Sequence, residues 1–177
     1  GRIKNASGVF EKLLAVNPND ISAIYWLGQT KLEVDEIMSA RLAETRQLYE
    51  KAMQSTNGAP LIKVGMGHVE ALAGNHENAR QHFEMALTMT RNRKGDDPVI
   101  VTAIGRALID AKGSDYKYAV RLLEDAAAKD PKNPDILLQL GNAHRKAGEG
   151  IGGGPAFQAY KKALEVSPSF APASLRL

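Results

Sequence analysis

The chain has no cysteine among its 177 residues. Disulfide bonds, thiolate nucleophiles and thiolate metal ligands are therefore excluded. No apolar run approaches the roughly 20 residues that a membrane-spanning helix needs, and the first four residues, Gly1 to Lys4, lack the features of a signal peptide. We expect no direct membrane insertion, and the missing cysteines are compatible with either the cytoplasm or the periplasm.

An excess of one charge is also lacking, since the net charge is only +3. The densest basic run, residues 91–94, is followed at once by Asp96 and Asp97. No aromatic side chains that could stack on bases are interleaved with this run. The pattern favours a solvated loop, and we expect no nucleic-acid partner.

The residue combinations of common enzymes are absent as well. The four histidines, His68, His76, His82 and His144, include no pair spaced three or four apart, so one helix face cannot hold a metal through two of them. Residues 148–153 match the glycine pattern of dinucleotide sites, but a helical pattern rather than a strand precedes them. A loop between helices is favoured over phosphate binding there, and the sequence predicts no enzyme, metal or cofactor.

What the chain does contain is a two-part pattern that runs through it four times. One half is centred on a glycine, at Gly28, Gly67, Gly105 and Gly141. The other half places an alanine four residues before an aromatic residue, as in Ala79 and Phe83 or Ala156 and Tyr160. Repeats of this length predict stacked helix pairs rather than a globular enzyme.

The clearest copy covers residues 134–170. Pro134 is suited to the first turn of a helix, an apolar stripe at helical spacing follows it, and Gly148 is suited to a left-handed cap at the end. A second helix is expected from about Pro155 to Pro168. Leu140-Gly141, followed by Ala156, Tyr160 and Pro168, resembles the tetratricopeptide repeat, although His144 stands where that family has an aromatic residue.

The resemblance implies an all-α fold, a right-handed solenoid of antiparallel helix pairs. It divides residues 1–177, taken as a single array, into a half repeat at 1–20, repeats at 21–59, 60–97, 98–133 and 134–170, and the start of a further repeat at 171–177. The glycines are 39, 38 and 36 residues apart, whereas the usual period is about 34. The extra residues are expected within 33–44, 91–97 and 148–155, in loops or in longer helices.

The glycines and alanines are expected to allow close approach of two helices, while the aromatic residue or leucine fills the space beside them. Helical steps from each glycine then define one face of each first helix. The resemblance implies that this face lines a concave groove for a peptide or protein segment. The predicted groove residues are Tyr25, Gln29, Val64, His68, Thr102, Arg106, Leu138, Asn142 and Arg145.

We expect these polar groups to be exposed in the groove, because burial alone would leave them without hydrogen bonds. Some family members hold a terminal carboxylate with a lysine, asparagine and arginine clamp. Asn142 and Arg145 fit part of it, but Gln29, His68 and Arg106 occupy the positions equivalent to Asn142, so that function is not carried over.

The expected function is that of a scaffold or adaptor that binds a protein or peptide, with Arg106 and Arg145 favouring an acidic ligand. The alternative is a structural spacer that positions other domains of a larger protein or complex, for example in secretion or the envelope. No polar capping repeat closes either end. The sequence therefore predicts an excerpt of a longer array, or end-to-end self-association through uncapped ends.

Overall fold

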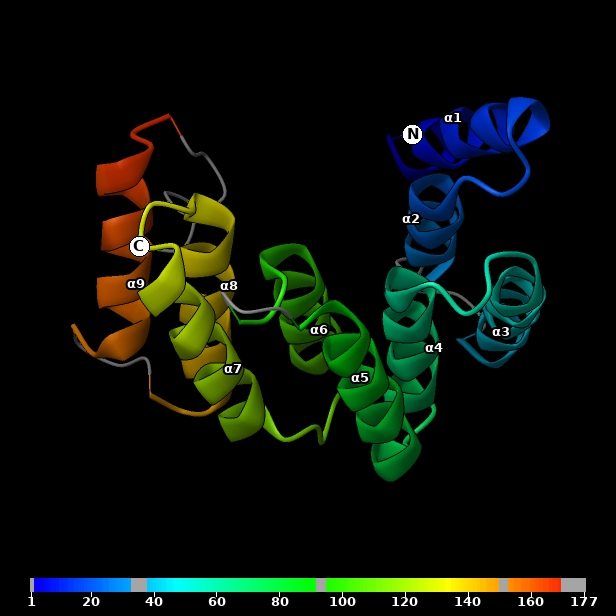
Figure 1. The fold of residues 1–177 in the computed structure, drawn as a ribbon. Helices are drawn as coiled ribbons and strands as arrows, with labels where there is room; N and C mark the ends of the chain where they lie inside the picture. Colours follow the sequence, from blue (N-terminus) through cyan, green and yellow to red (C-terminus); the bar gives the residue numbers. More distant parts are fainter. Residues whose placement is uncertain (1, 33–37, 92–94, 150–152, 170–177) are drawn as a thin grey trace. The chain divides into compact units, whose positions relative to one another are not determined.

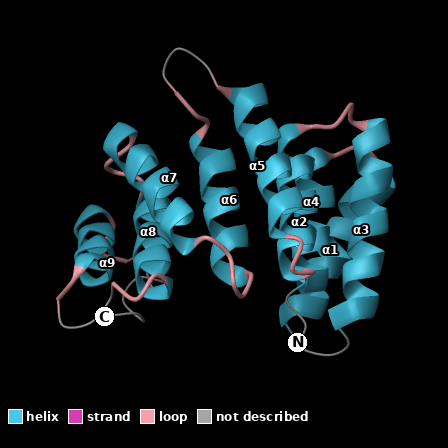
Figure 2. Ribbon diagram, turned by 90° about the horizontal axis from the view of Figure 1, so that it is seen from below, coloured by secondary structure: helices cyan, strands magenta, loops and turns pink. Residues whose placement is uncertain are grey.

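We describe a computed structural model of the chain, which covers residues 2–32, 38–91, 95–149 and 153–169. The regular elements of these ranges are all helices (Figure 2). In chain order they are α1 (Arg2–Val16), α2 (Ile21–Leu32), α3 (Met38–Ser55), α4 (Pro60–Leu72), α5 (His76–Thr90), α6 (Pro98–Asp110), α7 (Tyr116–Lys129), α8 (Pro134–Lys146) and α9 (Pro155–Val166) (Figure 1). Within the described ranges, no helix is long and apolar enough to cross a membrane.

The chain divides into two compact units, residues 1–90 and 91–177. In the first unit, α3 packs between α2 and α4, while α1 packs on α2 and α5 packs on α4. In the second unit, α7 packs between α6 and α8, and α9 packs on α8. Short connections between contacting helices make them antiparallel neighbours, so each unit is built from helix pairs.

Helix ends follow the local sequence closely. Proline occupies the first turn of α4, α6, α8 and α9, where its missing N–H removes no hydrogen bond. The side chain of Asn133 caps α8 by accepting from the N–H groups of Asp135 and Ile136. Gly148 ends the same helix at φ +83°, and the next N–H donates to the carbonyl of His144. The predicted left-handed cap is thus confirmed.

The extra residues of the first repeat lie partly in a helix. α3 begins at Met38 and runs for 18 residues, so residues 38–44 of the expected 33–44 insertion extend the second helix of the pair. Residues 33–37 lie outside the described part. Arg46, which follows these extra residues in α3, forms an ion pair with Glu70 of α4.

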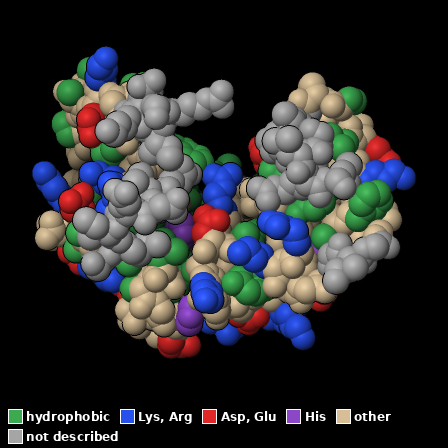
Figure 3. All heavy atoms as spheres, turned by 180° about the vertical axis from the view of Figure 1, so that it is seen from behind, with side chains coloured by type: hydrophobic (Ala, Val, Ile, Leu, Met, Phe, Trp, Pro, Cys, Tyr) green, Lys and Arg blue, Asp and Glu red, His purple; other side chains and the backbone are tan. Residues whose placement is uncertain are grey.

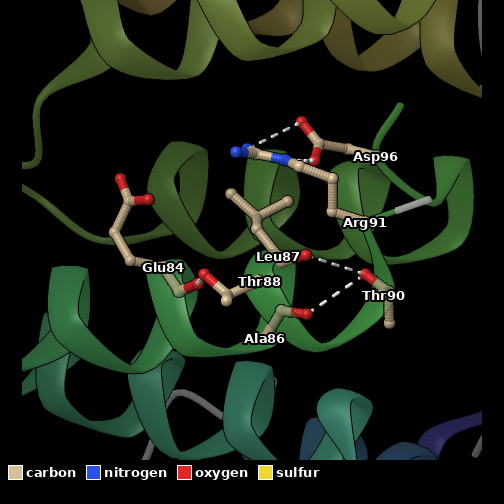
Figure 4. A network of polar contacts seen from close by, with 7 residues as sticks. All are labelled: Glu84, Ala86, Leu87, Thr88, Thr90, Arg91 and Asp96. Atoms are coloured by element: carbon tan, nitrogen blue, oxygen red, sulfur yellow. Dashed lines mark hydrogen bonds and ion pairs between the residues drawn. The ribbon is translucent and has the colours of Figure 1, made fainter. Parts of the chain in front are cut away.

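Side-chain hydrogen bonds form at the end of α5 and before the start of α6 (Figure 4). The hydroxyl of Thr90 donates to the carbonyls of Ala86, at 3.1 Å, and Leu87, at 3.3 Å, in the last turn of α5. Exposed Arg91 donates through Nε to Asp96 at 2.7 Å. Asp97 caps α6 by accepting from the N–H of Val99. Two acidic residues after the basic run therefore have local structural roles, while residues 92–94 lie outside the described part.

Candidate functional site

The four repeat glycines lie directly beneath large side chains of neighbouring helices. A Cβ atom placed on any of the four repeat glycines would clash with the overlying side chain. The overlying side chain is Tyr49 for Gly28, Phe83 for Gly67, Leu123 for Gly105 and Tyr160 for Gly141. The predicted close approach is confirmed, and each glycine is paired with the aromatic residue or leucine of its own repeat.

Tyr49 has a second glycine on its other side, because a Cβ on Gly65 of α4 would also meet its ring. Its hydroxyl donates to the carbonyl of Tyr25 at 2.9 Å and accepts from Nε2 of Gln29 at 3.1 Å. Burial raises the pKa of Tyr49, with a smaller contribution from Tyr25, so the hydroxyl stays protonated. Tyr49 therefore joins α2, α3 and α4 at one buried point.

Gln29 continues this network into the next repeat. Its Oε1 lies 2.9 Å from Nδ1 of His68, and because an amide oxygen only accepts, Nδ1 carries the proton. Gln29 is 5% exposed and His68 3% exposed. These side chains bond to each other inside the first unit, which satisfies groups that burial would otherwise leave unpaired.

The exposure expected for the predicted groove residues is therefore wrong in the first unit, where Tyr25, Gln29, Val64 and His68 are all buried. The physical reason is that α4 packs directly on α2, that the hydroxyl of Tyr49 bonds to Gln29, and that Gln29 in turn bonds to His68. No observation tests whether these residues line a ligand site, so that role stays a prediction.

The second unit repeats the arrangement with different partners. The hydroxyl of Tyr160 donates to Oδ1 of Asn142 at 3.0 Å, and Nδ2 of Asn142 donates to Gln139 at 3.3 Å. Asn142 is 6% exposed, and Leu138 packs in an apolar cluster with Tyr160. Expected exposure is wrong for Asn142 and Leu138 too, because α9 covers them.

A sequence feature that could have revealed these bonds is the choice of tyrosine at the packing position. Phe83 occupies it in the repeat where His68 follows the glycine, whereas Tyr49 and Tyr160 occupy it where an amide, Gln29 or Asn142, follows. A tyrosine hydroxyl above a helix glycine reaches the amide one residue further on. The pairing of tyrosine with amide is thus visible in the sequence once the packing is known.

Three predicted residues of the second unit reach solvent. Thr102 and Arg106 of α6 are half-buried, and Arg145 of α8 is exposed. The hydroxyl of Thr102 donates to the carbonyl of Pro98 at 2.7 Å. Since α6 packs on α8, we call the surface formed by Thr102, Arg106, Leu138, Asn142 and Arg145 the α6–α8 face. This face is the candidate site. Leu138 and Asn142 are its buried members, and Thr102, Arg106 and Arg145 are its solvent-accessible members.

The two units differ in charge. Residues 1–90 contain nine lysines and arginines against ten aspartates and glutamates, and residues 91–177 contain 14 against 10. The net charges are therefore −1 and +4, so the whole basic excess belongs to the unit that contains the α6–α8 face. Figure 3 shows lysine and arginine side chains interspersed with acidic and apolar ones on one side of the molecule. A modest positive potential favours acidic ligands without excluding neutral ones.

Two further polar clusters lie outside this face. In the second unit His144 is buried, its Nδ1 lies 2.6 Å from Oε2 of Glu149, and its Nε2 lies 3.8 Å from Glu124 of α7. The histidine thus takes the place of the family's aromatic residue and ties the start of the 148–155 loop to α8. Residues 150–152 of the glycine pattern lie outside the described part.

In the first unit, buried Glu70 of α4 is bonded by Arg46 of α3, and it accepts from Asn75 at 2.8 Å. Burial alone would raise the pKa of Glu70, but these bonds outweigh it and leave that pKa lowered. Half-buried His82 of α5 has a lowered pKa, chiefly because burial disfavours its charged form; Glu70 opposes this, whereas Lys63 and Arg46 contribute to it.

Both shifts predict that the first unit loses stability on acidification. A lowered folded-state pKa means that the unfolded chain binds the proton more readily, so stability falls as pH drops below about 6.5 for His82 and below about 4.5 for Glu70. We expect His82→Gln to reduce the slope of unfolding free energy against pH between about 5 and 7. This slope is measured by urea titrations at several pH values, followed by the fluorescence of Trp26, the single tryptophan.

His76→Gln is the control for this experiment, because His76 is exposed on the same helix. An unchanged slope in His82→Gln would contradict the assignment of the pH dependence to burial of this imidazole.

In the described ranges, no group of three or more histidine, aspartate or glutamate side chains is arranged to hold a metal ion.

No model of a known protein family matches the chain. The protein CTR9 homolog of Arabidopsis thaliana is 32% identical over 90 residues, which is 50% of this chain and 8% of that relative. The chain therefore corresponds to a small part of the length of the curated relative that it matches.

Solved structures, two of them described as TPR proteins, are similar over nearly the whole chain. TTC0263, a thermophilic TPR protein of Thermus thermophilus, is 21% identical with a TM-score of 0.65, covering 99% of this chain and 89% of its own. YrrB, a TPR protein with an unusual peptide-binding site, is 17% identical with a TM-score of 0.55, covering 99% and 84%. MamA is 18% identical with a TM-score of 0.51, covering 97% and 86%. The expected tetratricopeptide-like, all-α fold is confirmed.

Proposed function

We propose that this chain is a non-catalytic protein-interaction scaffold that holds a peptide or extended protein segment against the α6–α8 face. Helical repeats of this kind present extended surfaces that serve for binding. The observation that carries the proposal is the contrast between the units: predicted groove residues are buried in the first unit, whereas Thr102, Arg106 and Arg145 reach solvent in the second. A peptide-binding site in a protein of the same fold, YrrB, supports it.

The preferred ligand is acidic. Arg106 and Arg145 lie on the face, and the unit around them has a net charge of +4. Guanidinium groups bind carboxylates through two parallel hydrogen bonds, which gives orientation as well as affinity. Affinity that depends on such exposed pairs should weaken as salt rises.

The test is selection of ligands from a random-peptide library with the 177-residue chain as the target. We expect enriched sequences rich in aspartate and glutamate, and calorimetry should show that the variant Arg106→Glu, Arg145→Glu binds them about tenfold or more weakly, equivalent to about 1.4 kcal/mol. The matched control is Lys117→Glu, Arg121→Glu, which makes the same charge change at exposed positions of α7 and should bind like the wild type.

A structural spacer is the second candidate. One observation favours it. Gln29, His68 and Asn142 form hydrogen bonds with neighbours inside their own unit rather than presenting those groups to a ligand. In that case the chain positions other parts of a larger protein or complex, for example in secretion or the envelope. Failure to enrich any peptide, or peptides indifferent to both charge variants, would support the spacer and contradict the scaffold.

A further inference from the structure

An exposed valine adjoins the α6–α8 face. Val99 is 64% exposed and lies in the first turn of α6, directly after Pro98. It precedes Thr102 by three residues and Arg106 by seven, a spacing that places all three on one side of a helix. No other large apolar side chain in the described part of the second unit is as exposed. Val99 is absent from the predicted groove residues, but it continues their line along α6.

The corresponding position of α8 is acidic. Gly105 and Gly141 mark equivalent points of the two helices, and the residues six positions before them are Val99 and Asp135. Asp135 is exposed, and it precedes Leu138 of the face by three residues. Because α6 packs on α8, the surface at the amino-terminal ends of these two helices presents an aliphatic side chain and a carboxylate.

The opposite end of the same surface is basic. Arg106 lies in the second half of α6, and Arg145 and Lys146 are exposed in the last turn of α8. Asp110, one turn after Arg106, is the acidic residue that accompanies them, so three cations stand against one carboxylate. The surface therefore changes along its helices from apolar and acidic to basic.

We propose that the α6–α8 face selects peptides that carry a branched aliphatic residue three residues away from an acidic residue, and that Val99 sets this specificity. The inference rests on the proposed function, since it specifies the peptide ligand of the same face. Val99 and Arg106 are seven residues apart, which is about 10 Å along a helix axis. A peptide in the polyproline II conformation, common in unstructured chains, repeats its side-chain direction every three residues and rises about 9 Å over them. A carboxylate bound at Arg106 thus brings the side chain three residues away to Val99.

Covering Val99 supplies affinity that the charges alone do not give. Its exposed surface gains free energy on removal from water, whereas ion pairs between exposed groups are weak and screened by salt. Asp135 adds selectivity, because it repels a second acidic ligand residue at this end. We therefore expect the aliphatic contact to persist at salt concentrations that weaken the arginine contacts.

The test uses peptides selected from the random library by the 177-residue chain. We expect valine, isoleucine or leucine to be enriched three residues from an aspartate or glutamate. In calorimetry, Val99→Ser should weaken binding of such a peptide by about fivefold to tenfold. Serine in place of the peptide's aliphatic residue should weaken it equally, and combining both changes should cost little more than either alone, because both remove one contact.

Val9→Ser is the matched control, because Val9 is 56% exposed on α1 of the first unit and the same chemical change there should leave affinity unaltered. Val99→Ser should keep the wild-type circular dichroism and melting profile, since the valine is exposed. Acidic peptides without an aliphatic preference at this spacing, or additive losses when both changes are combined, would overturn this inference and leave the proposed function intact. Failure to select any acidic peptide would contradict both.

Discussion

Phe83→Ala should lower the free energy of unfolding by about 3–5 kcal/mol, among the largest single-site losses that we expect in this chain. The ring is fully buried, at 0% exposure, and it lies over Gly67, which has no side chain to fill the space. Removing it leaves a cavity between α4 and α5, the two helices that close the first unit. Urea unfolding monitored by Trp26 fluorescence and by circular dichroism measures the loss.

Met85→Ala is the control, because Met85 lies two residues away on the same helix and is 41% exposed. It should change stability by no more than about 0.5 kcal/mol, as is usual for surface substitutions. Combining Phe83→Ala with Gly67→Ala sharpens the test. A Cβ on Gly67 would lie 2.7 Å from Cδ1 of Phe83, so Gly67→Ala should be costly alone and mild once the ring is gone. Additive effects would contradict direct packing of this pair.

Gly65→Ala should have the second large effect, a loss of about 3 kcal/mol, the upper part of the range for overpacked cores. The new Cβ would lie 2.7 Å from Cε2 of Tyr49. The ring cannot retreat, because Gly28 bounds its other side and its hydroxyl is bonded to Tyr25. Thermal unfolding of the first unit, followed by Trp26 fluorescence, measures this effect.

Gly8→Ala provides the opposite case with the same chemical change. Gly8 lies within α1, and a Cβ there would meet nothing within 4 Å. The substitution should be neutral or stabilising by up to about 1 kcal/mol, because alanine loses less backbone entropy in a helix. If Gly65→Ala and Gly8→Ala had equal effects, helix propensity rather than the Tyr49 contact would govern both, and the packing argument would fail.

Much of the local structure follows from short sequence patterns. Pro134 and Asn133 start α8, Gly148 ends it, and Pro155 starts α9, because these residues act on the backbone within one helical turn. The pairing of Gly141 with Tyr160 was also predictable, since only a residue without a side chain lets an aromatic ring approach a helix axis so closely.

The role of the polar residues beside those glycines was not predictable in the same way. Gln29, His68 and Asn142 were expected in solvent, but each bonds to a side chain from another helix 18 to 39 residues distant along the chain. Burial of a polar group depends on whether a partner meets it in space. The Arg46–Glu70 pair was missed for the same reason, because nothing close in sequence links the two residues.

By itself, the sequence determined the helix pairs, their glycine contacts and the tetratricopeptide-like fold, because helix periodicity, caps and close-approach positions are local or repeated properties of the chain. Only the tertiary structure decided which predicted surface residues are accessible. It placed Gln29 and Asn142 under Tyr49 and Tyr160, and left Arg145 in solvent. Accessibility belongs to the packed helices together, since the same repeat position is buried or open according to which helix lies against it.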